Sequence, residues 1–204
     1  MNSKNSKKSN VKSLGKKVLN KRFAHLNKDP YTFEPFESWV WKKYESSEIV
    51  DFRKYISDNR KRLFFVGTDS QQKPKIRTCV FSSVLVAWDY DKKMGCGHGA
   101  TAIRTSDRRP IIPLEALSAR LMVEVQRSIE ICKVLEEELL NLSIEDNIDY
   151  TGNFEAVTID VNKSDEHKSG RYKDALVGMV MAYGWNVLIK PDNMTASKIA
   201  DRKC

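Results

Sequence analysis

Asp69 is the first acidic residue whose position suggests chemistry. It follows Leu63–Val66, an apolar run that predicts a buried strand, and lies in the polar group Thr68-Asp69-Ser70 at the end of that strand. A strand that is fixed by packing also fixes the acid at its end, which is a common way to hold a metal ligand. On this stretch alone, an Asp that begins a turn is the simpler explanation.

Glu124 interrupts the apolar face of the best predicted helix, residues 114–142. This segment has no Gly or Pro and is rich in residues that favour helices. The stripe predicted to face the core consists of Leu117, Leu121, Glu124, Ser128, Ile131 and Leu135. Because burial of an unpaired charge is costly, Glu124 needs either a metal ion or a buried Arg or Lys. Glu130 lies on a different, more polar face with Arg127 and Glu137, and we expect Glu130 to be solvated.

A second acid at the end of a strand is predicted in the C-terminal half. The sequence FEAVTIDV, residues 154–161, predicts a strand that carries Asp160 near its end. A polar loop at 163–169 follows and contains His167. Two carboxylates on strand ends would share a site if their strands were neighbours in one sheet.

The last acid of interest, Asp201, lies in a predicted helix over residues 193–202. Before it, residues 172–183 predict an amphipathic helix that ends at Gly184. Residues 185–189 then predict a short apolar strand, which Lys190 follows.

The elements that must position these acids begin with a helix predicted over residues 47–60, with Ser47 as a candidate N-cap. Strands are predicted at 62–71, 76–90 and 94–105, and short turns between them favour an antiparallel meander. The complete order is three strands followed by alternating helices and strands. This order predicts an α/β fold with a mixed sheet and helices on both faces.

Three glycines, Gly95, Gly97 and Gly99, share one face of the third predicted strand. Their missing side chains would let another backbone come close, and a sheet edge or a bulge explains them equally well. A dinucleotide-binding loop is excluded, because residues 101–105 predict a strand rather than the helix that such a loop opens.

The positive charge of the chain is concentrated at its N-terminus. The 204 residues carry a net charge of +8, and residues 1–28 hold nine basic residues and no acidic one. The remainder, with 26 basic and 27 acidic residues, is close to neutral. We therefore expect a disordered basic arm at 1–28, which could bind nucleic acid through charge, an extension at 29–60 that packs on the core, and a domain at 61–204.

Residues 31–44 are rich in aromatic side chains: Tyr31, Phe33, Phe36, Trp39, Trp41 and Tyr44. Such a strip could stack on bases or bind a partner protein, but packing against the core is the more common arrangement. The four cysteines form no disulfide or zinc spacing, which indicates free thiols in a reducing, cytoplasmic compartment. No apolar run is long enough for a membrane span, and no secretory signal is expected.

The strings FVGTDSQ, EVQRSIEICKVL, TIDVN and GWNVLIKPDNMTASKIADR resemble motifs of the ribonuclease H-like superfamily. They are most similar to those of the YkuK-type family of predicted ribonuclease H-like proteins, and the resemblance runs from Ile49 to Cys204. The resemblance implies a hydrolase that cleaves RNA, DNA or their hybrid with two Mg²⁺ or Mn²⁺ ions. A catalytically inactive module that binds nucleic acid or a partner protein is the alternative.

The resemblance also implies which residues form the site. Asp69, Glu124, Asp160 and Asp201 would be both the catalytic residues and the metal ligands. His167 could transfer a proton or be solvated, and Lys190 could hold a phosphate or pair with an acid. Ser70, a candidate for substrate contact or proton transfer, stands where typical ribonucleases H carry Gly.

Overall fold

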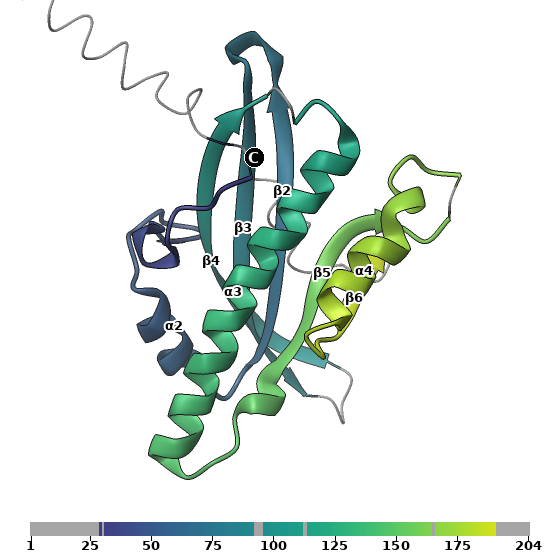
Figure 1. Cartoon of the computed structure of the whole chain (residues 1–204). Coiled ribbons are helices and arrows are strands. Elements are labelled where there is room, and N and C mark those ends of the chain that lie inside the picture. The colour runs from purple at the N-terminus through teal and green to yellow at the C-terminus, as the bar shows by residue number, and fades with distance from the viewer. Residues whose placement is uncertain (1–28, 30, 92–95, 112–113, 165, 191–204) are drawn as a thin grey trace, which may run out of the picture.

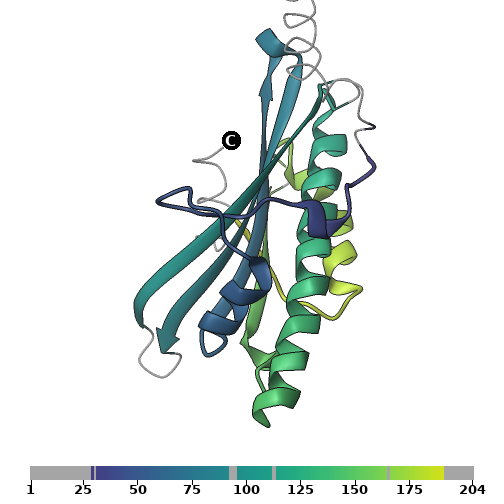
Figure 2. The ribbon, with the colours of Figure 1, turned by 90° about the vertical axis from the view of Figure 1, so that its left-hand side faces the viewer.

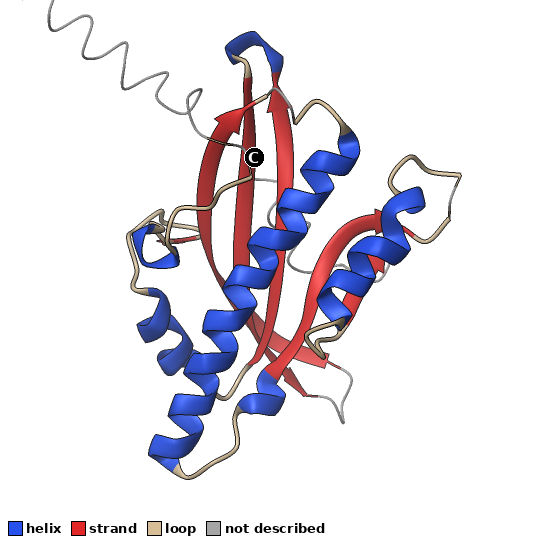
Figure 3. Ribbon diagram, viewed as in Figure 1, coloured by secondary structure: helices blue, strands red, loops and turns tan. Residues whose placement is uncertain are grey.

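A mixed six-stranded sheet with α-helices packed against it forms the described part of the chain (Figure 1 and Figure 3). The structure is a computed structural model that describes residues 29, 31–91, 96–111, 114–164 and 166–190. Its strands are β1 (Lys42–Lys43), β2 (Leu63–Lys73), β3 (Thr78–Asp91), β4 (Cys96–Pro110), β5 (Phe154–Asn162) and β6 (Val187–Lys190). Its α-helices are α2 (Phe52–Asn59), α3 (Leu117–Asp146) and α4 (Lys173–Met181). Single 3-10 turns lie at Phe36–Ser38, Pro74–Ile76, Thr151–Asn153 and Gly170–Tyr172.

The strand order across the sheet is β1-β4-β3-β2-β5-β6. Strands β2, β3 and β4 form the antiparallel meander, whereas β5 pairs in parallel with β2 and β6 in parallel with β5. The predicted α/β mixed sheet is therefore confirmed. The sequence analysis missed the short edge strand β1, whose two lysines pair with Ile103 and Arg104 of β4.

The three described α-helices lie on one face of the sheet, and we call this the helix face. Figure 2 shows α3 and α4 on the same side of the sheet, and side chains of α2 belong to the same core. On this face the sheet contributes Phe64, Val66, Leu85, Ala87, Ile103, Val157, Ile159 and Val161. We call the opposite side the outer face, and its apolar cluster contains Leu63, Phe65, Val84, Val86 and Ala156. The helix predicted at 193–202 and the basic arm at 1–28 lie outside the described residues.

The helix predicted over residues 47–60 is shorter in the structure and starts at Phe52. Asp51, not Ser47, is its N-cap, and its side chain accepts a hydrogen bond of 2.7 Å from the backbone N–H of Lys54. Ser47 instead has a left-handed backbone, with φ of 60°, in the turn after β1. The prediction was wrong because both residues are good cap types and spacing alone does not choose between them.

Strand β2 continues beyond the position at which we predicted its end. It pairs with β3 along its whole length, from Leu63 opposite Trp88 to Lys73 opposite Thr78. Asp69 is therefore not at a strand tip but within a strand. The pairing of β2 with β5 is shorter than its pairing with β3 and ends at Gly67 opposite Thr158. Asp69 thus lies just beyond the end of one pairing and in the middle of another.

The glycine-rich start of β4 is a bulge that is covered by a tryptophan. Pairing with β3 shifts register between Asp89 and Tyr90, and Gly99 opposite Asp89 has φ of 135°. A Cβ built on Gly97 would lie 2.1 Å from the indole Nε1 of Trp88. The space left by the missing side chain at Gly97 is therefore taken by an indole ring of the same chain.

The aromatic segment packs against the core on the helix face. Trp41 is 3% exposed, and its ring lies 4.7 Å from that of Phe52 on α2. Phe36 and Trp39 pack against the same core. Of the six aromatic residues, Tyr31 is the one that is exposed, at 47%. No helix in the described residues is long and apolar enough to cross a membrane.

Candidate active site

Asp69 and Asp160 stand level with each other on neighbouring parallel strands. The last pair between β2 and β5 is Gly67 opposite Thr158, and each Asp lies two residues beyond its member of that pair. Side chains alternate along a strand, so both acids belong to the outer face of the sheet. β5 curves away from β2 toward its C-terminal end (Figure 1). The sheet therefore brings these two predicted site residues to the same place.

Glu124 reaches the same place from the helix face. It is 5% exposed, and the Ser70 hydroxyl donates a hydrogen bond of 2.5 Å to its Oε1 atom. Burial first, and then the negative charge of Asp69, raise the pKa of Glu124 to about 8, although the Ser70 hydrogen bond acts in the opposite direction. The two carboxyl groups are thus close enough to interact although their residues come from opposite faces. At neutral pH the buried acid retains its proton.

Lys190 pairs with an acid of the candidate site. Its Nζ atom lies 2.5 Å from Oδ1 of Asp160, and both side chains are partly exposed. Of the two roles considered for Lys190, pairing with an acid is the one present in this structure. Asp160 is therefore neutralised by a cation of the chain itself.

The remaining predicted site residues are not brought to the acids within the described residues. His167 is exposed in the loop after β5, where its carbonyl accepts a hydrogen bond of 3.0 Å from the backbone N–H of Gly170. Asp201 lies outside the described residues. The described part of the candidate site consists of Asp69, Glu124 and Asp160, with Ser70 and Lys190 bound to two of these acids.

The donor atoms of the candidate site suit a hard divalent cation. Asp69, Glu124 and Asp160 offer carboxylate oxygens, the ligands that Mg²⁺ and Mn²⁺ prefer. The charge of Asp69 raises the pKa of Glu124, and a cation would relieve this repulsion. Within the described residues, however, no three His, Cys, Asp or Glu side chains are grouped closely enough to hold a metal ion. The carboxylate oxygens are suitable ligands for Mg²⁺ or Mn²⁺. The acids of the described residues alone, however, do not form a full set of metal ligands.

A buried polar network that the sequence analysis missed lies beneath the acids, between α3 and the sheet. Ser128 donates to Thr68 at 3.0 Å, Thr68 donates to Ser83 at 2.9 Å, and the Arg127 Nε donates to Ser83 at 3.1 Å. Our assignment of Arg127 to a polar face away from the core was wrong, because this side chain is 2% exposed. Its spacing of three residues from Glu124 was the signal that could have placed it on the buried side.

Arg127 joins this network to the aromatic segment. Its guanidinium lies 4.2 Å from the ring centroid of Trp39, and Arg109 lies 4.6 Å from that of Phe33. Both arginines contact Oδ2 of Asp107, at 3.4 Å and 2.7 Å respectively. Burial lowers the pKa of Arg127 to about 10, so the side chain remains charged at neutral pH. Its charge is balanced by Asp107 and by the electron-rich face of the indole ring.

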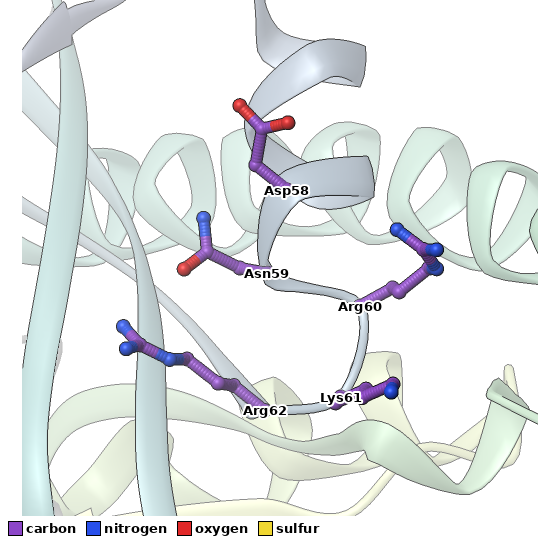
Figure 4. A pocket seen from close by; sticks show the side chains of 5 residues that line it. All are labelled: Asp58, Asn59, Arg60, Lys61 and Arg62. Atoms are coloured by element: carbon purple, nitrogen blue, oxygen red, sulfur yellow. The ribbon is translucent and has the colours of Figure 1, made fainter.

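A surface pocket of about 270 Å³ lies at the opposite end of β2 (Figure 4). It is lined by Asp58, Asn59, Arg60, Lys61 and Arg62. Arg60 is bound to Asp146 at 2.7 Å, and Arg62 lies 3.4 Å from the Thr101 hydroxyl. Seven residues of extended strand separate Arg62 from Asp69, or about 23 Å. We therefore do not include this pocket in the candidate active site, although it is hollow and basic.

Comparison with known proteins assigns a family to the greater part of the chain. A family model described as Ribonuclease H-like matches residues 46–204, which contain all four predicted site acids. No curated protein and no solved structure matches the chain.

Proposed function

Because the chain belongs to the ribonuclease H-like family, we propose that it is a metal-dependent nuclease that hydrolyses phosphodiester bonds of RNA or DNA. One observation carries the proposal. Asp69 and Asp160 lie level on adjacent parallel strands, and Glu124 is buried beside them against Ser70. These acids come from two strands and a helix in the order that the resemblance implies. Within the described residues no basic side chain is bonded to the buried carboxyl of Glu124, which favours a role in binding a cation.

In this proposal Asp69, Glu124, Asp160 and Asp201 bind Mg²⁺ or Mn²⁺. Two such ions, when bound, supply an activated water and stabilise the leaving 3′ oxygen. The side chains of the chain position this chemistry: Ser70 fixes the rotamer of Glu124, and Lys190 orients Asp160. Lys190 would be released to a substrate phosphate when Asp160 takes part in binding the metal. His167 is proposed as a group that exchanges protons with solvent.

The first experiment compares wild type with Asp69→Asn. We expect Mn²⁺ titration by calorimetry to give two bound ions in wild type and a loss of binding in the variant. Labelled RNA, DNA and hybrid should be cleaved by wild type with Mn²⁺ and not by Asp69→Asn. The matched control is Asp174→Asn, because Asp174 is an exposed Asp on α4 that pairs with Lys173. The proposal fails if wild type neither binds Mn²⁺ nor cleaves any of the three substrates.

A second candidate function is a nucleic-acid-binding module without catalysis. The ion pair between Lys190 and Asp160 favours it, because a lysine already neutralises one of the acids. The nine basic residues at 1–28 would then supply most of the affinity. Deletion of residues 1–28 separates the two functions. A module that only binds should lose affinity and salt dependence, whereas a nuclease should retain metal-dependent cleavage with a higher apparent KM.

A further inference from the structure

The outer face of the sheet changes from apolar to polar at the level of Gly67. On one side of this level lies the apolar cluster that contains Phe65, Val84 and Val86. On the other side, Asp69 pairs with Ser82, and Ser82 pairs with Ser106 on β4. A polar row therefore spans three strands, but Ser82 in its middle is buried, so the exposed end of the row is Ser106 on β4.

Strand β4 divides residues 104–109 between the two faces. Thr105, Asp107 and Arg109 belong to the helix face, and Arg104, Ser106 and Arg108 belong to the outer face. The inner set is buried or partly buried, and two of its members form the ion pair of Asp107 with Arg109. On the outer face, Ser106 and Arg108 are exposed, and Arg104 donates a hydrogen bond of 3.1 Å to the Ser47 hydroxyl. Arg108 forms no ion pair within the described part of the chain.

The two outer arginines flank an exposed hydroxyl at a spacing that suits a phosphate group. Arg104 and Arg108 each lie two residues from Ser106, which is about 7 Å along a strand and within the length of an arginine side chain. Ser106 is two strands from Asp69, or about 10 Å. Guanidinium groups bind phosphate oxygens through paired hydrogen bonds, and exposed hydroxyls add a further donor. The spacing therefore suits a phosphate near the bond that is cleaved.

Ser106 also borders a surface pocket of about 180 Å³. The pocket is lined by Glu34, Ser38, Trp39, Val40, Thr105, Ser106, Asp107 and Arg127. It lies next to the part of β4 beyond its short pairing with β1. A strand of nucleic acid that crosses Ser106 would reach this pocket next. Trp39 already packs against Arg127 there, and the hydroxyl groups and the carboxyl groups of Glu34 and Asp107 suit a base better than a phosphate.

We propose that Arg104, Ser106 and Arg108 bind the phosphodiester backbone of the substrate strand on β4, beside the pocket that Trp39 lines. This inference rests on the proposed nuclease function, whose substrate it would orient. The basic arm at 1–28 would attract nucleic acid through its charge but would not orient it. Three residues at fixed positions on β4 would determine where the substrate strand lies.

The test measures binding of labelled single-stranded RNA and DNA to the full chain by fluorescence anisotropy in EDTA. We expect Arg108→Ala to weaken binding roughly three- to tenfold and to reduce the slope of log K against log salt by about 0.7, the value for one phosphate contact on a single strand. Arg108→Lys should retain most of the slope. Ser106→Trp, which blocks the path without changing charge, should weaken binding and leave the slope unchanged.

The control is Lys61→Ala. Lys61 is an exposed cation at the far end of β2, beside the pocket of Figure 4. Unchanged affinity and slope in Arg108→Ala, or an equal loss in Lys61→Ala, overturns the proposal, because binding would then be diffuse. Because the assay contains no divalent cation, this result is independent of cleavage. Failure of the nuclease function would appear instead in the comparison of wild type with Asp69→Asn.

Discussion

Glu124 should make the metal-free protein less stable as the pH rises, and Glu124→Gln should remove this dependence. The folded state raises the pKa of Glu124 from 4.5 to about 8, chiefly through burial. A raised pKa means that the folded state holds the proton more tightly than the unfolded state. The stabilisation is therefore complete below pH 4.5 and is lost as the pH rises toward 8.

The magnitude follows from the two pKa values. One pKa unit corresponds to about 1.4 kcal/mol. Because Glu124 is only 5% exposed, screening by solvent reduces this free energy only slightly. Between pH 5 and pH 8 the free energy of unfolding of wild type should fall by about 3 kcal/mol relative to Glu124→Gln. The Gln side chain keeps an oxygen that can accept the Ser70 hydrogen bond and has no charge at any pH. Any other effect of the Glu124→Gln substitution on the free energy of unfolding should be the same at each pH.

The assay is urea unfolding of both proteins in EDTA at pH 5, 6, 7 and 8. Effects of other titrating groups cancel in the difference between the two proteins. Glu130→Gln is the control, because Glu130 pairs with Lys133 at the surface, and its profile should parallel that of wild type. Parallel profiles for wild type and Glu124→Gln would show that Glu124 has an ordinary pKa, and the description of its site would be wrong.

Further measurements address the metal, the buried arginine and the bulge. Mn²⁺ binding near pH 7 should release about one proton, because Glu124 must ionise to bind the metal. Calorimetry in buffers of different ionisation enthalpy measures the number of protons released. The absence of proton release would exclude Glu124 as a ligand. Arg127→Met should lower the free energy of unfolding by about 3 kcal/mol, because it removes a buried partner of Asp107; urea unfolding checks this, and a change below about 1 kcal/mol would contradict it. Gly97→Ala should displace the Trp88 indole and cost about 1–3 kcal/mol, which tryptophan fluorescence and thermal unfolding would detect; an unchanged spectrum and Tm would contradict it.

The order of strands and helices could be predicted from the sequence because apolar periodicity and turn residues record it directly. The position of Thr68, Asp69 and Ser70 within β2, rather than at its end, could not. Thr68 and Ser70 look like turn residues, yet the first bonds to Ser83 and Ser128, and the second bonds to Glu124. A strand whose inward side chains meet polar partners has no apolar pattern to reveal it. The partners come from residues that are distant in sequence.

Buried charged side chains are also difficult to predict, because their partners are distant in sequence. Glu124 was predicted to face the core because apolar residues surround it on one stripe of the helix. Arg127 is as buried but lies at the edge of that stripe, and its partners Asp107 and Trp39 come from β4 and from the aromatic segment. A single helix shows which positions face inward but not what they meet. Side chains that are buried against polar or aromatic partners are therefore the ones that sequence reasoning misplaces.

The location of the candidate active site follows from the unequal lengths of two pairings along β2. On the β3 side the ladder continues to Lys73, which holds the backbone of Asp69 in place. On the β5 side the ladder ends at Gly67, which leaves that edge of β2 without a paired strand at the level of Asp69. A carboxyl from the helix face can approach one from the outer face only where the sheet is interrupted in this way. The rigid strand and the open edge thus occur at the same residue, and this combination makes Asp69 suited to hold a cation.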